Sequence, residues 1–278
     1  MLAAGMAIPL RSPDEINDIA QAAAVFWRAV TGVAGEVRAG MSASEIEQVV
    51  AARLGGIGAG LILRGYTQGR TPPFPAAACV SVNEEVVHAV PGGRTLHAGD
   101  IVTVDTAATI TGERGQWCLD AATTVVVGEA GAQAGLSGVG GSRAGMLAGA
   151  ARAVLTSAID AAQPGRTWAD VAEAARQAAT SAGVRLLGGY SGHGIGRRLH
   201  EPPRLDLGPN PSPADAELVL RPGMVFTIEP IVIEGGSGAA GVSVAEDGWT
   251  VRTTDGAWAA HEERMVAVER WGSRVLTA

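Results

Sequence analysis

A short pattern that occurs twice in the chain constrains its fold more than any other feature. The segments are Gly40-Met-Ser42-Ala-Ser-Glu45-Ile46 and Gly165-Arg-Thr167-Trp-Ala-Asp170-Val171, which lie 125 residues apart. In each, a Ser or Thr precedes an acidic residue by three places, which is typical of a capping box at the start of a helix. Each copy follows a helical stretch and precedes β-rich sequence, so the chain is predicted to contain two similar α/β halves. Unrelated helix caps that look alike are the alternative interpretation.

The remaining elements follow from local spacing. Ser12-Pro13-Asp14-Glu15 is a helix start, and apolar residues from Ile16 to Val30 follow at helical intervals. A second Ala- and Leu-rich helix is expected from Ala144 to about Ala162. The expected strands are Ala78–Ser81, Asp100–Ala107, Asp120–Val127, Met224–Ile228, Ile231–Glu234, Trp249–Thr253 and Arg264–Val268. Gly112 to Gly115 supplies a turn between the second and third of these.

Charge and hydropathy exclude several classes of protein. The 278 residues carry a net charge of -7, and all 21 basic residues are Arg. This charge argues against a protein that binds nucleic acid, because such a protein needs a basic face. The apolar runs are shorter than the about 20 residues that span a bilayer, and the N-terminus does not read as a signal peptide. We therefore expect a cytoplasmic protein with no nucleic-acid specificity and no membrane association.

Acidic residues on the apolar strands are the candidate functional residues. Asp105 is expected to end one strand and Asp120 to begin the next, while Glu229 and Glu263 lie at the ends of two later strands. A carboxylate in such a position is costly unless it is paired or binds a cation. Together with His193, which lies among glycines, these residues suit two divalent ions, with Mn, Fe, Co or Zn as candidates. Such a pair of ions performs hydrolytic chemistry. The alternative is a set of unrelated turn acids and an ordinary histidine.

Longer segments resemble a known family. The segments are IPLRSPDEI, VSVNEEVVHAVP, LHAGDIVTVD, DAATTVVVG, SGHGIGRRLHEPP, LRPGMVFTIEP and EDGWTVRTTDGAWAAHEE. They closely resemble the methionine aminopeptidases, in particular the type I enzymes of the pita-bread metallopeptidase fold. The resemblance implies an α+β fold, with two pseudo-symmetric α/β halves around a central antiparallel sheet. Residues 12–278 would form one catalytic domain after an N-terminal segment of residues 1–11. Only 28 residues separate His200 from Glu229, which leaves no room for the helical insert of the type II enzymes.

The same resemblance implies roles for individual residues. Asp105 and Asp120 would be metal ligands, with Asp120 bridging both ions, and His193, Glu229 and the bridging Glu263 would complete the set. His88 and His200 would be the histidines that contact the substrate, and Glu229 would also take a proton from the nucleophilic water. The methionine pocket would be lined by Tyr66, Phe74, Cys79, Leu199 and Trp249, in addition to the two histidines. Without the resemblance, Phe74, Cys79 and Trp249 read as ordinary core residues.

The chain departs from the family pattern in three places. The connection between Asp105 and Asp120 is a few residues longer than usual, so Glu113 or Gln116 is a candidate for disturbing the metal site. Arg264 and Met265 replace a usual His-Thr after Glu263, and His261 replaces a common Gln. Glu262 is the alternative ligand if the alignment is displaced by one residue, because strand alternation points only one of the two neighbours inward.

The resemblance implies a metal-dependent aminopeptidase. It would remove the initiator methionine from peptides and nascent chains with a small second residue, using a water or hydroxide that bridges two metal ions. Its partners would be the N-termini of peptides and nascent chains, and the ribosome exit region is a further candidate partner. We expect the protein to be a monomer. Two alternatives remain: an Xaa-Pro aminopeptidase of the same fold, whose usual additional N-terminal domain has no space here, and a non-catalytic binding protein.

Overall fold

The computed structural model describes residues 7–128, 141–190, 192–208, 212–235 and 241–278. Its helices are α1 (Pro13–Ala34), α2 (Ala43–Gly56), α3 (Arg143–Ala161), α4 (Trp168–Ser181) and the short α5 (Pro213–Ala216). The four long helices confirm those expected from the sequence. None of the helices in these ranges is both long enough and apolar enough to cross a bilayer.

The repeated pattern forms the same structure in both places. Ser42 accepts a hydrogen bond from the backbone N–H of Glu45, whose carboxylate accepts one from the backbone of Ser42. Thr167 and Asp170 make the same reciprocal pair at the start of α4. Each capping residue also makes an isolated antiparallel bridge, Ser42 to Thr95 and Thr167 to Val219. The equivalent surroundings support two related halves rather than two chance caps.

The strands pair into four small antiparallel sheets. They are β1 (Gly60–Leu61), β2 (Cys79–Val82), β3 (Glu85–Val87), β4 (Ile101–Gly112), β5 (Gly115–Val126), β6 (Val184–Leu186), β7 (Gly192–Gly194), β8 (Glu201–Leu205), β9 (Val225–Ile228), β10 (Ile231–Glu234), β11 (Val242–Val244), β12 (Val251–Thr253), β13 (Ala259–His261), β14 (Arg264–Glu269) and β15 (Gly272–Val275). One sheet joins β4 to β1, β2 and β5, and another has the order β15-β14-β9-β7-β8. An isolated antiparallel bridge between Ala122 and Glu263 connects these two sheets. Most of the strands that were not expected from the sequence have only two to four residues, which is too short for a clear pattern. They are β1, β3, β6, β7, β8, β11, β13 and β15.

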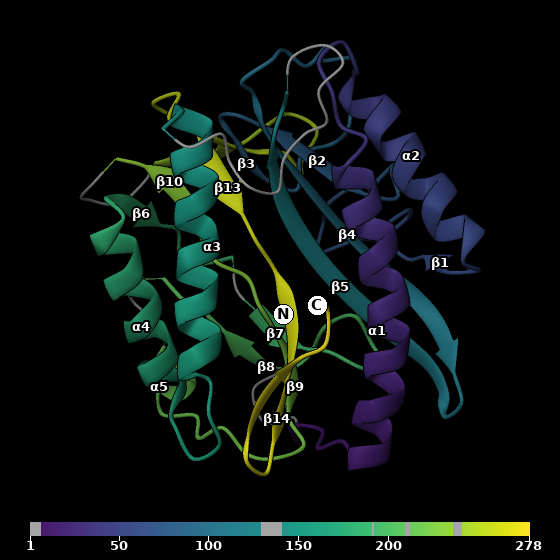
Figure 1. Ribbon diagram of the computed structural model, residues 1–278, viewed down its shortest axis with the longest axis vertical. Coiled ribbons are helices and arrows are strands. Elements are labelled where there is room, and N and C mark those ends of the chain that lie inside the picture. Colours follow the sequence, from purple (N-terminus) through teal and green to yellow (C-terminus); the bar gives the residue numbers. More distant parts are fainter. Residues whose placement is uncertain (1–6, 129–140, 191, 209–211, 236–240) are drawn as a thin grey trace.

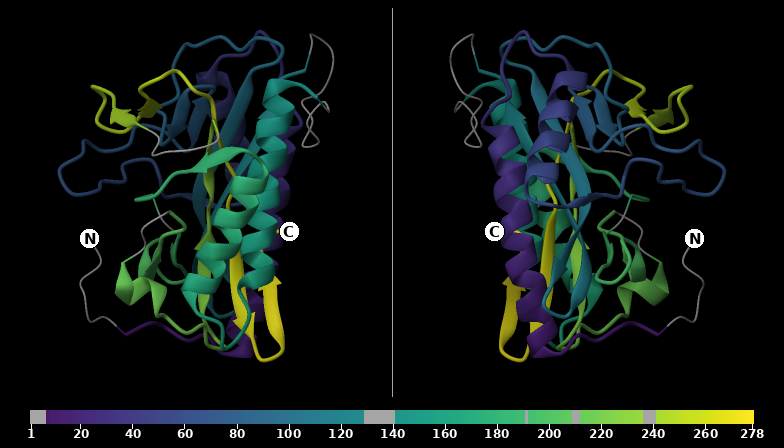
Figure 2. Two further views of the ribbon diagram at one scale, coloured as in Figure 1. Left: turned by 90° about the vertical axis from the view of Figure 1, so that its left-hand side faces the viewer. Right: turned by 90° about the vertical axis from the view of Figure 1, so that its right-hand side faces the viewer.

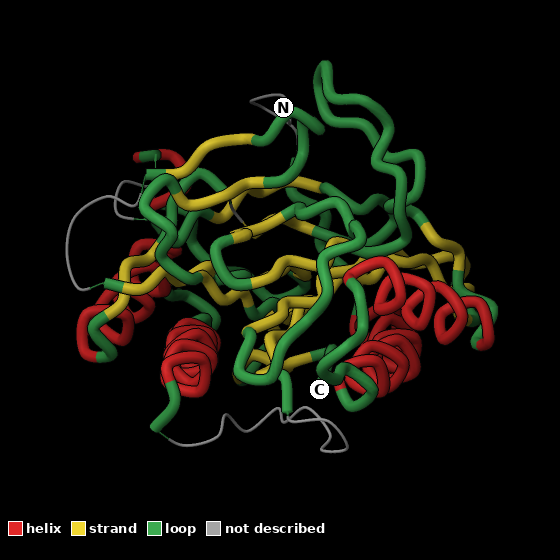
Figure 3. Tube along the Cα trace, turned by 90° about the horizontal axis from the view of Figure 1, so that it is seen from above, coloured by secondary structure: helices red, strands yellow, loops and turns green. Residues whose placement is uncertain are grey.

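The four long helices lie on one face of the strands. The pair α1 and α2 lies on one side and the pair α3 and α4 on the other, with the strands between them (Figure 1). Seen from above, the four long helices lie along one face, and loops cover the opposite face (Figure 3). The loop that follows β1 extends furthest from the helices (Figure 2). Each pair packs over its own apolar core, one containing Phe26 and Trp117 and the other Trp168 and Phe226.

The β4–β5 hairpin corrects one sequence expectation. Asp105 and Asp120 lie in the middle of twelve-residue strands, not at a strand end and a strand start. The strands continue to Gly112 and Gly115, which pair directly across a two-residue turn. The extension is stable because buried Asp18 of α1 accepts hydrogen bonds from the backbone of the turn and from Trp117 Nε1 at 2.7 Å.

Candidate metal centre and substrate pocket

All of the residues selected from the sequence line one cavity of about 490 Å³. They are Tyr66, Phe74, Cys79, His88, Asp105, Asp120, His193, Leu199, His200, Glu229, Trp249 and Glu263. The first half of the chain supplies the long hairpin, and the second half supplies β7 and the segments around Glu229 and Glu263. The cavity therefore depends on the packing of both halves.

The hairpin places Asp105 and Asp120 on one face of the sheet. Asp105 pairs with Ala122 and Asp120 with Ala107, so the two carboxylates are diagonal neighbours on the two strands. Such neighbours lie within reach of each other across an antiparallel pair. Burial raises the pKa of Asp120 to about 8, and burial together with the charge of Asp120 raises the pKa of Asp105 well above its ordinary value.

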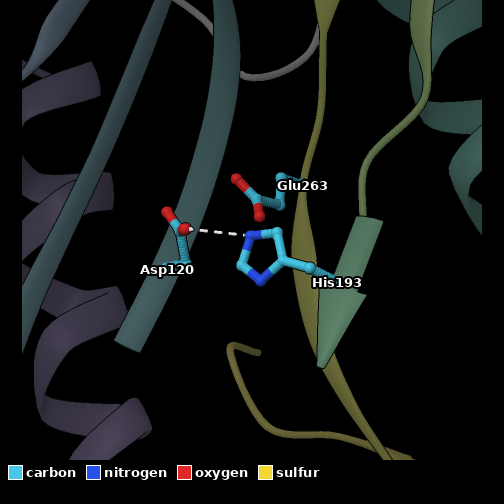
Figure 4. Close-up of side chains that lie close together, drawn as sticks. All are labelled: Asp120, His193 and Glu263. Atoms are coloured by element: carbon cyan, nitrogen blue, oxygen red, sulfur yellow. Dashed lines mark ion pairs between the residues drawn. The ribbon is translucent and has the colours of Figure 1, made fainter. Parts of the chain in front are cut away.

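His193 enters the site from β7. Its Nε2 lies 3.6 Å from Asp120 Oδ2 (Figure 4). Its Nδ1 lies 3.1 Å from the carbonyl oxygen of Gly194, and its Nε2 is also 3.8 Å from Glu229 Oε1. If Nδ1 donates to this carbonyl, the lone pair of Nε2 faces the carboxylates. Burial lowers the pKa of His193 to about 4, so the ring is neutral at physiological pH. The flanking glycines are required, because a Cβ at Gly194 would overlap the backbone of Pro202.

Glu229 and Glu263 approach from the other strands of the same sheet. Glu229 directly follows β9, and its Oε1 accepts a hydrogen bond of 2.9 Å from the Thr227 hydroxyl. The backbone N–H of Glu263 donates to the Ala122 carbonyl at 3.0 Å, which holds Glu263 against the hairpin. Burial raises the pKa of both carboxyl groups well above the ordinary value, and the charge of Asp120 adds to the effect.

These side chains fit a divalent cation. One ligand atom from each of Asp120, His193 and Glu263 lies within 4.8 Å of the others (Figure 4). Glu263 Oε1 is buried and has no hydrogen-bond partner among the described residues, which is costly for a carboxylate oxygen. Burial raises the pKa values of the four carboxyl groups, and a bound cation would stabilise their ionised forms. Carboxylates together with a neutral imidazole are also ligands that divalent first-row metals accept.

Glu262, the alternative ligand, points away from the cavity. Its carboxylate is fully buried and accepts hydrogen bonds from Arg152 at 3.2 Å and Arg264 at 3.3 Å. The structure therefore places Glu263, and not Glu262, beside the other candidate ligands. Glu113 and Gln116 are exposed near the hairpin tip and are not among the cavity-lining residues.

His88 and His200 line the same cavity as the carboxylates and the apolar residues. The ring centroid of His200 lies 4.2 Å from that of His193, and its Nδ1 lies 3.0 Å from the Tyr66 hydroxyl. His88 has a positive φ of 56°, a strained conformation that is frequent at functional positions. Burial lowers the pKa of His88 to about 4 and that of His200 to about 3, so both rings are neutral at physiological pH.

The apolar end of the cavity is a small aromatic cluster. Phe74, Cys79 and Trp249 are buried, and the two aromatic rings meet edge to face at 5.3 Å. Trp249 Nε1 donates to the Pro72 carbonyl at 2.8 Å, which fixes the indole in the wall. Tyr66 packs against this cluster, and Leu199 lines the cavity beside His200. An apolar space with polarisable walls suits an unbranched thioether side chain.

The departures from the family pattern lie directly behind the candidate ligands. Arg264 Nη1 donates to the Ala122 carbonyl at 2.9 Å, and its guanidinium stacks 3.8 Å from the Trp27 ring centroid. The sulfur of Met265 accepts from the backbone N–H of Asp120 at 3.5 Å. His261 is buried, and neither of its ring nitrogens has a partner among the described residues.

Sequence reasoning missed Tyr190 and Arg204, which also line the cavity. The ring of Tyr190 lies 5.7 Å from that of His88. Arg204 pairs directly with His193 across β7 and β8. Neither strand was expected from the sequence, so no pattern indicated that Arg204 faces the site.

The fold and this cluster of buried ligands define a metallopeptidase. The model of metallopeptidase family M24 matches residues 17–269, and the chain belongs to this family. The methionine aminopeptidase of Aquifex aeolicus is 34% identical over 98% of this chain and 99% of that protein. The crystal structure of the methionine aminopeptidase from Thermotoga maritima matches with a TM-score of 0.82 and 33% identity, over 98% of this chain and 99% of that one. These similarities confirm the predicted α+β pita-bread fold and place the chain among the methionine aminopeptidases within the family.

A prolidase from Pyrococcus horikoshii shares the fold at lower similarity. Its TM-score is 0.65 at 21% identity, and the match covers 97% of this chain but 63% of the prolidase. That likeness shows a common fold and does not extend to activity. The Xaa-Pro alternative is therefore less supported than the methionine aminopeptidase prediction.

Proposed function

We propose that this protein is a methionyl aminopeptidase, a hydrolase that removes the N-terminal methionine from peptides and nascent proteins whose second residue is small. The observation that carries the proposal is the position of the aromatic pocket beside the carboxylate cluster within one cavity. The carboxylates suit the free amine of a bound substrate, and the pocket of Trp249 suits an apolar side chain on the same residue. A residue with both groups is the N-terminal residue of a peptide. The full-length similarity to methionine aminopeptidases supports methionine as that residue.

The ligands of the proposed centre are Asp105, Asp120, His193, Glu229 and Glu263. We infer that they hold two divalent ions, of Mn, Fe, Co or Zn. When bound, such ions supply Lewis acidity, which polarises a carbonyl group and makes water more acidic. The neutral imidazole of His193 presents Nε2 toward the carboxylates, as a nitrogen ligand must.

The other residues orient the peptide and move protons. Burial raises the pKa of Tyr66, so its hydroxyl stays protonated, and we infer that it donates to His200 Nδ1, which lies 3.0 Å away. That contact leaves the N–H of His200 at Nε2, where it donates to the carbonyl oxygen of the scissile amide as negative charge develops. His88, which lines the same cavity, also orients the amide. Glu229, whose orientation Thr227 fixes, takes the proton from the attacking water.

The proposal is tested by methionine release from Met-Gly-Gly amide after the protein has been stripped of metal. Addition of Mn, Co, Fe or Zn, one at a time, should restore cleavage, and Asp120→Asn should remain inactive with every metal. The peptide Ala-Pro-Gly tests the Xaa-Pro alternative, because an enzyme of that class would cleave it in preference. A protein that binds no metal and cleaves neither peptide would support the non-catalytic alternative and overturn the proposal.

A cytoplasmic location, a monomeric state and a contact with the ribosome exit region stay predictions from the sequence. The comparisons support action on peptide N-termini as the property shared with the relatives.

A further inference from the structure

The rim of the cavity contains one feature that the proposed reaction does not use. Among the described residues that line the cavity, Arg204 is the only Arg, and all four acidic residues belong to the proposed metal centre. Arg204 is exposed, whereas the acidic residues lie deep in the site. A peptide leaving the metal centre for solvent therefore passes from a negative interior to a positive rim.

The direction of Arg204 follows from the strand pairing. Arg204 on β8 lies directly opposite His193 on β7. Residues that oppose each other in an antiparallel pair project from the same face of the sheet, with Cβ atoms about 5 Å apart. Since His193 points into the metal centre, Arg204 projects beside it, on the side toward solvent.

The side chain is also held at this position. Its Nη2 lies 3.5 Å from the carbonyl oxygen of Gly189, and Gly189 N–H donates to Asp206 Oδ2 at 3.1 Å. Gly189 and Tyr190 form the adjacent part of the cavity wall, and Tyr190 reaches the ring of His88. Because Arg204 is itself one of the residues that line the cavity, its charge acts on a molecule bound there.

From this geometry we propose that Arg204 and the Gly189–Tyr190 wall form a subsite for a carboxylate on the third residue of the substrate. The inference rests on the proposed function, because it takes the N-terminal residue to lie in the pocket of Phe74, Cys79 and Trp249. An extended peptide advances about 3.5 Å per residue, so two residues span about 7 Å from the scissile bond. A guanidinium binds a carboxylate with paired N–H donors. The carboxylate is either an acidic side chain at position three or the free C-terminus of a tripeptide.

Two peptide pairs distinguish these sources. Met-Gly-Glu amide against Met-Gly-Gln amide tests the side chain, and Met-Gly-Gly acid against Met-Gly-Gly amide tests the C-terminus. The metal-loaded wild-type enzyme should cleave the carboxylate member of at least one pair with about fivefold higher kcat/KM, mainly through a lower KM. Arg204→Gln should bring that ratio close to one, Arg204→Lys should keep part of it, and 1 M salt should reduce it in the wild type.

Arg198→Gln is the matched control, because Arg198 is an exposed arginine of the connection between β7 and β8 that does not line the cavity. This variant should keep the wild-type ratio. A wild-type ratio of one for both pairs, or an unchanged ratio in Arg204→Gln, would overturn the subsite while leaving methionine release intact. Failure of the proposed function itself looks different, since no methionine would then be released from any of the four peptides.

Discussion

Glu262 and Glu263 are adjacent in the sequence, but their carboxylates lie on opposite sides of the chain. Glu263 faces Asp120 and His193, whereas Glu262 is enclosed between Arg152 of α3 and Arg264. The bridge between Ala122 and Glu263 fixes this orientation, because it aligns the segment with the hairpin. Alternation along an extended chain then assigns the two neighbours to different environments.

The pair offers a direct test of the metal centre. Glu263→Gln should lower metal affinity by at least about tenfold and abolish methionine release, because a ligand charge is lost. Glu262→Gln should retain the bound metal but lower the free energy of unfolding by on the order of 3 kcal/mol, because Arg152 and Arg264 lose their buried partner. Metal analysis and chemical denaturation measure the two effects. Equal loss of metal in both variants would contradict the assignment of Glu263.

The buried carboxyl groups predict an unusual pH dependence for the metal-free protein. The pKa of Asp120 is raised to about 8, and those of Asp105, Glu229 and Glu263 are raised well above their ordinary values. Between pH 6.5 and 8 the folded protein therefore holds protons that the unfolded chain has lost. Because the folded state binds more protons, its stability must fall as pH rises through this window.

The same carboxyl groups set the size of this fall in stability, and replacing one of them provides the control. Each carboxyl group that stays protonated in the folded state contributes up to about 1–2 kcal/mol over that window. The histidines of the cavity have pKa values lowered to about 3 or 4, so they are neutral in the folded state, whereas the unfolded chain still holds part of their protons at pH 6.5. Each of them therefore offsets the effect by about 0.4 kcal/mol over this window, which is less than one carboxyl group contributes. Urea denaturation at pH 6.5 and 8 tests the prediction. Asp120→Asn should weaken the dependence, and a metal-free wild type that gains stability at pH 8 would contradict it.

Arg264 should support the metal centre without contacting the metal. It donates to the carbonyl oxygens of Ala122 and Glu263 and stacks on Trp27. Arg264→Lys loses the planar stack and the forked donor geometry, so metal affinity should fall about 10- to 100-fold. Trp27→Leu removes the stack but keeps the hydrogen bonds, and it should lower stability by about 1 kcal/mol with little change in metal affinity. Calorimetric metal titration separates the two variants, and similar metal affinity in Arg264→Lys and the wild type would refute the supporting role.

The aromatic pocket predicts a selective effect on substrate binding. Trp249→Ala should raise the KM for Met-Gly-Gly amide by roughly tenfold or more, because it removes one wall of the space that takes the methionine side chain. Trp258 stacks on Arg143 away from this pocket and provides the control. Steady-state kinetics of Trp249→Ala and Trp258→Ala make the comparison. A normal KM in Trp249→Ala would place the methionine side chain elsewhere.

Much of the local structure could be predicted from the sequence because its causes are local. The capping boxes at Ser12, Ser42 and Thr167 depend on residues three places away, and all three helices begin where expected. The strand Ile231–Glu234 has the predicted bounds because Pro230 precedes it and its residues are β-branched apart from the last. The hairpin was predicted too short, since its length depends on Asp18 in a distant helix.

The sequence by itself determined which residues were available for metal and substrate chemistry, and its motifs identified the family that they resemble. Only the tertiary structure decided how they are oriented, because this depends on pairings between segments far apart in the chain. The bridge from Ala122 to Glu263 turns Glu262 away, and the pairing of β7 with β8 brings Arg204 beside His193. Side-chain direction in a strand is set by its hydrogen-bonded register, and a shift of one residue reverses it. Register across 141 positions, from Ala122 to Glu263, is a property of the packed core and not of any local pattern.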